Sequence, residues 1–326
     1  MRWRFGKTTH RYRVYGLVVA SDSEIPELER LLVSDHKTPD VVLSLKPLEM
    51  GVIGDLTPIL NSSRPDGSPW LVCSKTSGGY LLSFVDHAEF WVGRSHGQVI
   101  CVRTRGQIPD NTLRHLLLDQ AFPFVLNVLG KHPIHATAVS VRGGVCAFMG
   151  PAGSGKSTLA ASLLVEGHDL FADDCLPLIQ ARGKILAVPA YPGLRLWRDV
   201  SDAMGISGRS NVKVSHYSEK SRMVAFSTRF ASKPAPLVRI YAVERDDDAI
   251  SRGVPPSIEP LLGRDALLPL IRASYSFDVT DRRALKRDFD FLAALATSVP
   301  VRRLRVAHDL SRLPAVREAV LSDLHN

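Results

Sequence analysis

Residues Ile134 to Leu178 read IHATAVSVRGGVCAFMGPAGSGKSTLAASLLVEGHDLFADDCLPL, and this stretch decides the fold. Its centre, Gly150-Pro-Ala-Gly-Ser-Gly-Lys156-Ser157, fits the phosphate-loop pattern G-x-x-x-x-G-K-[ST]. An apolar run, Val145 to Met149, precedes the motif, and a run typical of a helix, Ser157 to Val165, follows it. The motif needs a strand before it and a helix after it. These flanks therefore favour a nucleotide-binding loop over a glycine-rich turn that matches by chance.

The loop carries the groups that a bound triphosphate needs. Glycines 150, 153 and 155 let backbone N–H groups curl around phosphate oxygens, and the start of the helix adds positive potential. Lys156 would reach the β- and γ-phosphates, and the Ser157 hydroxyl would bind Mg²⁺. We therefore expect ATP and Mg²⁺ as cofactors. The residues expected to bind the nucleotide are Gly150, Pro151, Ala152, Gly153, Ser154, Gly155, Lys156, Ser157 and Thr158.

Two neighbouring acids, Asp173 and Asp174, follow the predicted helix. The helix leads roughly 17 Å away from the phosphates, at about 1.5 Å per residue, and Gly167 ends it. Residues 168–173 then return roughly 17–20 Å as an extended chain. If that strand lies beside Val145–Met149, both carboxylates reach the phosphate end of the sheet. There one acid could bind Mg²⁺ and the other could accept a hydroxyl proton; a solvated acidic turn or a helix cap is the alternative.

Together these residues resemble the catalytic core of bacterial HPr kinase/phosphorylases and the related HPr-kinase-like serine kinases. The resemblance covers about 45 residues and includes His135, the phosphate loop, Gly167-His168 and Ala172-Asp173-Asp174. It implies that Asp173 is the acid/base group and that Asp174, with Ser157, supports the metal. It also implies that His135 lies beside the phosphate loop, where the imidazole could pair with a catalytic carboxylate; a structural histidine is the alternative.

The segment from Pro189 to Trp197, PAYPGLRLW, departs from the enzymes that act on HPr. Those enzymes have a metal-binding Glu in the comparable place, and this chain has none. The segment is similar to one in HPr-kinase-like proteins of ribosomal peptide pathways, including lasso-peptide precursor kinases. The resemblance therefore implies that the substrate is a peptide or small protein that carries the acceptor serine. It favours a lasso-type precursor over HPr as that substrate. Arg195 is expected either to stabilise the charge on a transferring phosphoryl group or to form a structural salt bridge.

Size and composition set broad limits. A chain of 326 residues is long enough for two domains. Its 45% hydrophobic and 23% charged content is typical of a water-soluble globular protein, and no run of 18 apolar residues predicts a membrane span. The basic N-terminus lacks an apolar signal core, so we expect a cytoplasmic protein. The cysteines have no C-x-x-C spacing and are expected to be buried thiols; they are Cys73, Cys101, Cys146 and Cys175.

The formal net charge of +8 raises the question of a nucleic-acid partner. The arginines are dispersed, and no module of aromatic and basic residues repeats. We therefore expect no nucleic-acid binding and interpret the charge as that of a solvated surface. A positive rim around a nucleotide site or an acidic peptide is a compatible alternative.

Residues 1–130 are expected to form a small antiparallel β domain with a bridging helix. Strands are predicted at Arg11–Ala20 and Val41–Leu45, a loop at 55–69, and a meander of hairpins from Trp70 to Arg103. An edge strand of this domain could receive an extended peptide. Asp110 to Leu129 is helical in character, with a kink expected at Pro123. Four aromatic residues are expected in the core: Trp70, Tyr80, Phe90 and Trp91.

Residues 131–326 are expected to form the HPr-kinase-like phosphate-loop domain, which gives the chain an α+β or α/β fold overall. Leu237–Arg245 predicts a buried strand, and Thr280–Thr297 a long helix. The helix should face the core through Ala284, Leu285, Phe289, Leu292 and Leu295. The polar segment Gly205–Met223 predicts a mobile loop that could close over phosphate through Lys220 and Arg222, and residues 246–248 predict an acidic turn.

The leading functional hypothesis is an ATP-dependent serine kinase. A phosphate-loop ATPase without an acceptor is the second hypothesis, but such proteins carry the metal-binding acid on a later strand, whereas Asp173 comes only 17 positions after Lys156 (173 − 156). The third hypothesis is a nucleotide sensor or DNA-binding regulator that has lost catalytic activity. The intact set of Lys156, Ser157 and the two acids argues against such a loss. HPr-type family members are hexamers; whether this chain forms a homo-oligomer is left open by its sequence.

Overall fold

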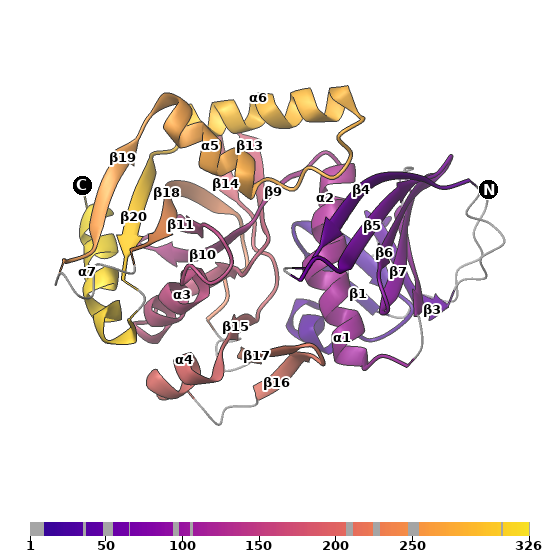
Figure 1. Ribbon diagram of the computed structural model, residues 1–326, viewed down its shortest axis with the longest axis horizontal. Coiled ribbons are helices and arrows are strands. Elements are labelled where there is room, and N and C mark those ends of the chain that lie inside the picture. The colour runs from indigo at the N-terminus through magenta and orange to yellow at the C-terminus, as the bar shows by residue number, and fades with distance from the viewer. Residues whose placement is uncertain are drawn as a thin grey trace. The chain divides into compact units, whose positions relative to one another are not determined.

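The computed structural model describes residues 10–34, 37–47, 55–64, 66–93, 98–104, 107–206, 211–223, 229–246, 254–307 and 309–325. Its helices and sheets form an α+β fold (Figure 1). The chain divides into two compact units. Unit 1 comprises Met1–Gly130 and Ser276–Leu285, and unit 2 comprises Lys131–Tyr275 and Lys286–Asn326. Unit 1 thus takes in a short segment from the second half of the chain.

Unit 1 is built on a sheet with the strand order β1-β2-β3-β8-β7-β6-β5-β4. The strands are β1 (His10–Val14), β2 (Leu17–Ser21), β3 (Val41–Pro47), β4 (Thr57–Ser63), β5 (Pro69–Lys75), β6 (Gly79–Phe84), β7 (Ala88–Gly93) and β8 (Gln98–Thr104). The expected antiparallel sheet is wrong in part, because β3 runs parallel to both β2 and β8. The 3₁₀ helix η1 (Pro26–Leu31) lies between β2 and β3, and such a crossover, unlike a hairpin turn, brings the chain back in the same direction.

The loop expected at residues 55–69 is also wrong in part, since β4 lies within it and pairs with β5. β4 is the outer strand of the sheet and has no buried residue. An edge strand tolerates Pro58 and polar side chains, so its composition resembles that of a loop. The core aromatic residues are confirmed for Tyr80, Phe90 and Trp91, which are buried.

The bridging helix is continuous but changes its winding. It runs as α1 (Asp110–His115), a π-helical turn (Leu116–Ala121) and α2 (Phe122–Val128). Pro123 lacks an N–H and would interrupt an α-helix at this point. The π turn directly precedes it, so the local irregularity expected at Pro123 takes the form of a widened turn.

The segment Ser276–Leu285 is fastened to unit 1 by an aromatic contact and a charged cluster. Phe277 packs edge-to-face on Phe124, with ring centroids 5.0 Å apart. The Asp278 carboxylate accepts hydrogen bonds from the Tyr80 hydroxyl at 2.9 Å and the Lys75 ammonium at 3.2 Å. Burial alone would raise the pKa of Asp278, but hydrogen bonds from Thr280, Tyr80 and Lys75 outweigh burial and lower this pKa to about 2.

We expect Asp278→Asn to lower the free energy of unfolding of unit 1 by roughly 1–3 kcal/mol at pH 7. The folded-state pKa lies below the ordinary value of 3.8, so the carboxylate contributes stability above about pH 4 and loses it as the pH falls towards 2. Urea unfolding followed by tryptophan fluorescence at pH 7 and pH 2.5 measures the difference. An equal loss at both pH values would show that the charge of Asp278 is not what stabilises the unit.

Unit 2 is built on a sheet with the order β12-β10-β11-β18-β14-β13-β9, and β20 pairs with β18 and β19. The strands are β9 (His132–Ile134), β10 (Ala136–Val141), β11 (Gly144–Met149), β12 (Asp169–Ala172), β13 (Leu176–Ala181), β14 (Lys184–Ala187), β18 (Ala235–Arg245), β19 (Ser257–Leu261) and β20 (Val301–Val306). The hairpin β10–β11 turns at Arg142 and Gly143, whose φ angles of 53° and 80° suit a tight turn.

The predicted neighbour of the strand before Asp173 is wrong. β12 pairs with β10 rather than with β11, because the hairpin places β10 on that side of β11. The expected direction is nevertheless correct. Ala136 of β10 lies opposite Met149, and Ala138 lies opposite Ala172, so the ends of β11 and β12 meet at the same edge of the sheet.

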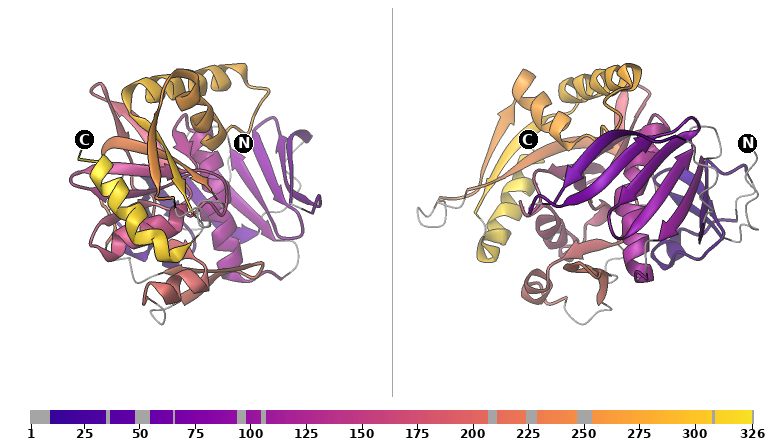
Figure 2. Two further views of the ribbon diagram at one scale, coloured as in Figure 1. Left: turned by 60° about the vertical axis from the view of Figure 1, so that its left-hand side comes forward. Right: turned by 45° about the vertical axis from the view of Figure 1, so that its right-hand side comes forward.

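Helices α3 (Lys156–Val165) and α7 (Leu313–Asp323) cover one face of this sheet, and Figure 2 shows α7 against its β19–β20 edge. They share a core with Phe148 and Tyr241, whose rings stack 5.5 Å apart. The other helices are α4 (Arg198–Ala203), α5 (Gly263–Ala273), α6 (Arg282–Ser298) and η6 (Leu310–Arg312). The core position expected for Phe289 of α6 is wrong, since its side chain is 50% exposed; Phe291 is buried instead and stacks on His132.

The mobile loop expected at Gly205–Met223 is wrong over most of its described part. β16 (Asn211–Ser215) and β17 (Ser218–Met223) form a hairpin that joins β15 (Leu194–Leu196) in a small sheet. Its apolar side chains, Leu194, Leu196 and Met223, enter the core of unit 2, which fixes a segment whose other residues are polar. Ser207 and Ser210 of the predicted loop, and Asp247 and Asp248 of the predicted acidic turn, lie outside the described residues.

The expected buried thiols are confirmed for the cysteines whose side chains are described. Cys73, Cys146 and Cys175 are buried free thiols; the side chain of Cys101 lies outside the described ones. Within the described ranges, no helix combines the length and the apolar character that a membrane crossing requires.

Candidate active site

The phosphate-loop motif lies where several parallel strands end. β18 runs parallel to β11, and β20 runs parallel to β18. β12 runs in the same direction, because β10 is antiparallel to both β11 and β12. A cavity of about 1040 Å³ opens at these carboxyl ends and is lined by residues 152–159 of the loop and α3. Ligands of α/β sheets bind at this edge.

The loop has the backbone conformation that its glycines predict. Gly150, Gly153 and Gly155 have φ angles of 151°, 80° and 94°. A Cβ atom on Gly150 would lie 2.6 Å from the Val243 carbonyl oxygen, so only glycine fits there. The Lys156 ammonium donates to the carbonyl oxygens of Gly150 at 2.9 Å and Pro151 at 3.0 Å. Burial lowers the pKa of Lys156 from its ordinary value. The lysine is thus held within the loop, at one wall of the cavity.

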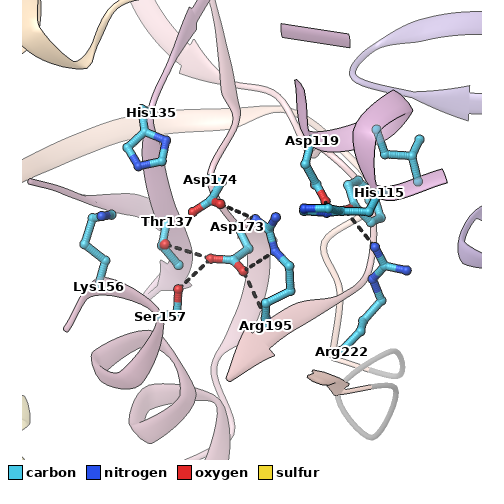
Figure 3. Close-up of polar contacts among 12 residues, drawn as sticks. His115, Asp119, His135, Thr137, Lys156, Ser157, Asp173, Asp174, Arg195 and Arg222 are labelled. Carbon is cyan, nitrogen blue, oxygen red and sulfur yellow. Dashed lines mark hydrogen bonds and ion pairs between the residues drawn. The ribbon is translucent and has the colours of Figure 1, made fainter. Parts of the chain in front are cut away.

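Asp173 is the centre of the polar contacts (Figure 3). Its Oδ1 accepts from the Ser157 hydroxyl at 2.8 Å and from the Thr137 hydroxyl at 2.9 Å. Its Oδ2 accepts from the backbone N–H of Arg195 at 3.0 Å and from the Arg195 Nε at 3.2 Å. The side chain is only 3% exposed. Four donors therefore hold this carboxylate in place and tie β12 to the start of α3.

Asp174 differs from its neighbour. Its side chain is 28% exposed, and it contributes to the cavity wall, which Asp173 does not. Its Oδ2 lies 2.6 Å from Nη2 of Arg195, so this guanidinium contacts both acids. Asp174 also has a φ of 66°, in the left-handed region that few residues other than glycine adopt. Backbone strain of this kind clusters at functional sites.

Tyr275 is a site residue that the sequence did not reveal. Its hydroxyl donates to the Asp174 carbonyl oxygen at 3.0 Å and lies 3.2 Å from Nδ1 of His135. Since the hydroxyl proton is used on Asp174, the Nδ1 of His135 is the donor in the second bond. Burial lowers the pKa of His135, so the imidazole is neutral at neutral pH. Tyr275 lies 101 residues after Asp174 and belongs to no motif, so no local signal could have found it.

Of the two basic residues expected to close over phosphate, only Lys220 lines the cavity. Arg222 is buried, with its guanidinium 5.5 Å from the centre of the Tyr191 ring and Nη2 3.4 Å from the Tyr191 hydroxyl. A Cβ atom on Gly193 would lie 2.8 Å from Cδ of Arg222. The close packing indicates that Arg222 supports the small sheet.

The donor set suits Mg²⁺. A hydroxyl, from Ser157, and two carboxylates lie at the phosphate loop, and hard oxygen ligands of this kind are what Mg²⁺ prefers. Among the described residues, no group of three or more His, Cys, Asp or Glu side chains could form a metal cage. Mg²⁺ is usually held by one or two carboxylates together with phosphates and water, so such a cage is not required.

No protein-family model matches the chain, and no curated protein matches it. Among solved structures, the chain is similar to the HPr(Ser) kinase/phosphatase from Coxiella burnetii at 13% sequence identity and a TM-score of 0.33. The match covers 59% of this chain and 97% of that chain.

Proposed function

We propose that this chain is an ATP-dependent kinase that phosphorylates a serine of a peptide or small protein. The observation that carries the proposal is the Asp173 cluster. Asp173 comes from the end of β12 and accepts a 2.8 Å hydrogen bond from Ser157 of the phosphate loop, while Asp174 beside it faces the cavity. One edge of the sheet thus carries both a loop that suits a triphosphate and a carboxylate that can reach the hydroxyl of an acceptor.

The roles of the loop residues follow from their contacts. Backbone N–H groups of residues 152–158 hold the phosphates of ATP, and the Lys156 ammonium moves from the loop carbonyls to the β- and γ-phosphates. Ser157 would bind Mg²⁺ through its hydroxyl oxygen, and Asp173 would orient that hydroxyl by accepting its hydrogen bond. The metal would neutralise charge on the transferring phosphoryl group. A phosphate-loop hydroxyl bonded to an acid from another strand of the sheet is the arrangement that phosphate-loop enzymes use for this purpose.

Asp174 is the acid/base group in this proposal. It takes the proton of the acceptor serine as the serine oxygen attacks the γ-phosphorus, and the bond from the γ-phosphorus to the β–γ bridging oxygen breaks, leaving ADP. This assignment reverses the one that the family resemblance implies. The four hydrogen bonds on Asp173 occupy its oxygens, whereas Asp174 has an exposed side chain on the cavity wall.

Arg195 compensates part of the negative charge of Asp173 and Asp174. Its buried guanidinium contacts Asp173 at 3.2 Å and Asp174 at 2.6 Å, and it also lines the cavity. The ion pairs support the structural alternative raised from the sequence, and the position of Arg195 on the cavity wall supports a role in stabilising charge on the transferring group.

The experiment uses ATP labelled on the γ-phosphate with an array of serine peptides that includes a lasso-type precursor, and with HPr. We expect label on a serine with the wild-type chain, and a loss of about 100-fold or more in kcat with Asp174→Asn at unchanged ATP affinity. Release of label only as free phosphate, with no labelled peptide or protein, would favour the ATPase hypothesis. Equal kcat for wild type and Asp174→Asn would remove Asp174 as the base.

We expect Tyr275→Phe to lower kcat about fivefold while the KM for ATP stays unchanged. The variant keeps the ring but removes the hydroxyl that holds the Asp174 carbonyl and His135, and one hydrogen bond of this kind contributes about 1 kcal/mol. These two hydrogen bonds end on residues outside the phosphate loop. Tyr217→Phe is the matched control, because Tyr217 is 40% exposed in the turn between β16 and β17. An unchanged kcat for Tyr275→Phe would show that the hydroxyl does not position the acid.

A further inference from the structure

The cavity has two sides, defined by the order of the strands. β18 and β20 follow β11 in one direction across the sheet, and β10 and β12 follow it in the other. The phosphate loop, at the end of β11, therefore lies between the end of β12, where Asp174 stands, and the ends of β18 and β20. Neighbouring strands lie about 4.8 Å apart, so the two sides are separated by roughly 10–20 Å.

The side at β18 and β20 is mainly apolar. Val243 and Val306 come from the two strands, Leu310 comes from η6, and Leu313 and Val316 come from the start of α7. The charged residues that line this side are Arg245 and Asp309. A flat aromatic ligand needs an apolar slot of this kind next to the phosphate loop. We assign this side to the nucleobase of ATP, which leaves the side at Asp174 for the acceptor.

On the acceptor side the cavity is bordered by the small sheet, where one cross-strand pair is notable. Trp197 directly follows β15 with an extended backbone, so its side chain lies on the same face as that of Arg195, two residues earlier. Trp197 and Lys220 directly follow the last pair of the β15–β17 ladder, Leu196↔Ser221, and the Lys220 ammonium lies 5.7 Å from the centre of the indole ring. Both residues line the cavity.

The exposure and charge of this pair are those of a binding surface. Trp197 is 48% exposed, whereas the Arg195 side chain next to it on that face is 5% exposed. Within the described part of the chain, Lys220 has no acidic group at ion-pair distance. Lys220 also lies close enough to Lys156 for its charge to lower the pKa of Lys156, although burial of Lys156 is the larger cause. An indole surface beside an uncompensated cation suits a ligand that is both flat or apolar and negatively charged.

We propose that Trp197 and Lys220 form the acceptor subsite and that they select a serine peptide with an acidic residue and an aromatic or apolar residue beside the serine. The inference rests on the proposed kinase function and names its substrate class. The apolar or aromatic side chain packs on the indole ring, and the acidic residue pairs with Lys220. The serine hydroxyl then lies towards Arg195 and Asp174, further along the same face.

Acrylamide quenching of tryptophan fluorescence tests what covers Trp197. The difference between the wild-type chain and Trp197→Phe isolates this residue from the other tryptophans. Two probes are compared, a non-hydrolysable ATP analogue with Mg²⁺ and a serine heptapeptide with Asp and Phe neighbours. We expect the peptide to protect Trp197 and the nucleotide to leave it accessible. Protection by the nucleotide alone would place the base on Trp197 and overturn the subsite.

Charge reversal tests the role of Lys220. With wild type, the acidic peptide should bind about fivefold more tightly than a copy that has Lys in place of Asp, and Lys220→Glu should reverse the preference. Lys184→Glu is the control, since Lys184 is exposed at the start of β14 and lies outside the cavity wall. Equal binding of the two peptides, or a larger loss of nucleotide than of peptide affinity in Lys220→Glu, contradicts the proposal.

The subsite and the kinase can fail separately. If the acidic peptide protects Trp197 but no serine is ever labelled, the kinase proposal fails and the peptide site stands. If peptides are labelled but Lys220→Glu leaves their order of preference unchanged, the kinase stands and the subsite fails.

Discussion

Lys156→Met will reduce phosphoryl transfer by about 1000-fold or more. In the proposed kinase the ammonium is the cation that the phosphate loop brings to the phosphates, and loss of one preorganised group that stabilises transition-state charge costs two to three orders of magnitude in many enzymes. The apolar stem of methionine fills the same space, and removal of a partly desolvated cation should not destabilise the fold. Transfer of labelled phosphate and thermal unfolding are measured on the same preparation.

Lys184→Ala is the matched control, because Lys184 is exposed at the start of β14 and lies outside the cavity wall. It should transfer phosphate at the wild-type rate. A Lys156→Met variant that keeps more than a tenth of the wild-type rate would contradict the assignment of the triphosphate to this loop.

Asp173→Leu will destabilise unit 2 by about 3–5 kcal/mol and abolish transfer. The carboxylate is buried and is the shared acceptor of Ser157, Thr137 and Arg195. Its removal leaves a buried guanidinium without one of its two acids, and breaking one partner of a buried ion pair has a cost of this size. Asp169→Ala, at the exposed start of the same strand, is the control and should change stability by less than about 0.5 kcal/mol.

A double variant separates charge from shape. Asp173→Leu combined with Arg195→Met removes both charges, so it should recover part of the lost stability but none of the activity. If the double variant is less stable than Asp173→Leu alone, the ion pair is not the cause of the loss. In that case the hydroxyls of Ser157 and Thr137, left without an acceptor, are the larger effect.

The sequence predicts correctly those features that depend on residues close together in the chain. The loop, its glycines and the helix after it follow from the motif, and the return of the chain to Asp173 follows from the lengths of a helix and a strand. The estimate of distance was correct even though β10, and not β11, pairs with β12. A chain that travels out and back by equal lengths returns to the same edge, whichever strand it pairs with.

Features that depend on distant contacts could not be predicted. Tyr275 reaches Asp174 because α5 ends beside β9 and β10, where the His135 N–H donates to the Ala273 carbonyl oxygen at 2.6 Å. β4 and the β16–β17 hairpin were assigned to loops because their composition is polar, and only pairing with neighbouring strands makes them regular. The parallel pairs of β3 were missed because strand direction depends on the path of the connection.

The proposed division of roles between the two acids rests on their contacts. Both are aspartates and they are adjacent in the sequence, and the family resemblance assigns the acid/base role to the first. The contacts instead distinguish a carboxylate held by four donors from one that faces the cavity.

A crystal structure of the chain with a non-hydrolysable ATP analogue and Mg²⁺ tests the central claim most directly. The account predicts the γ-phosphate at the phosphate loop, in contact with Lys156, with Ser157 at the metal and the Asp174 carboxylate within about 3–6 Å of the γ-phosphorus, which leaves room for one hydroxyl between them. A γ-phosphate bound away from Lys156, or separated from Asp174 by the width of the sheet, would contradict it.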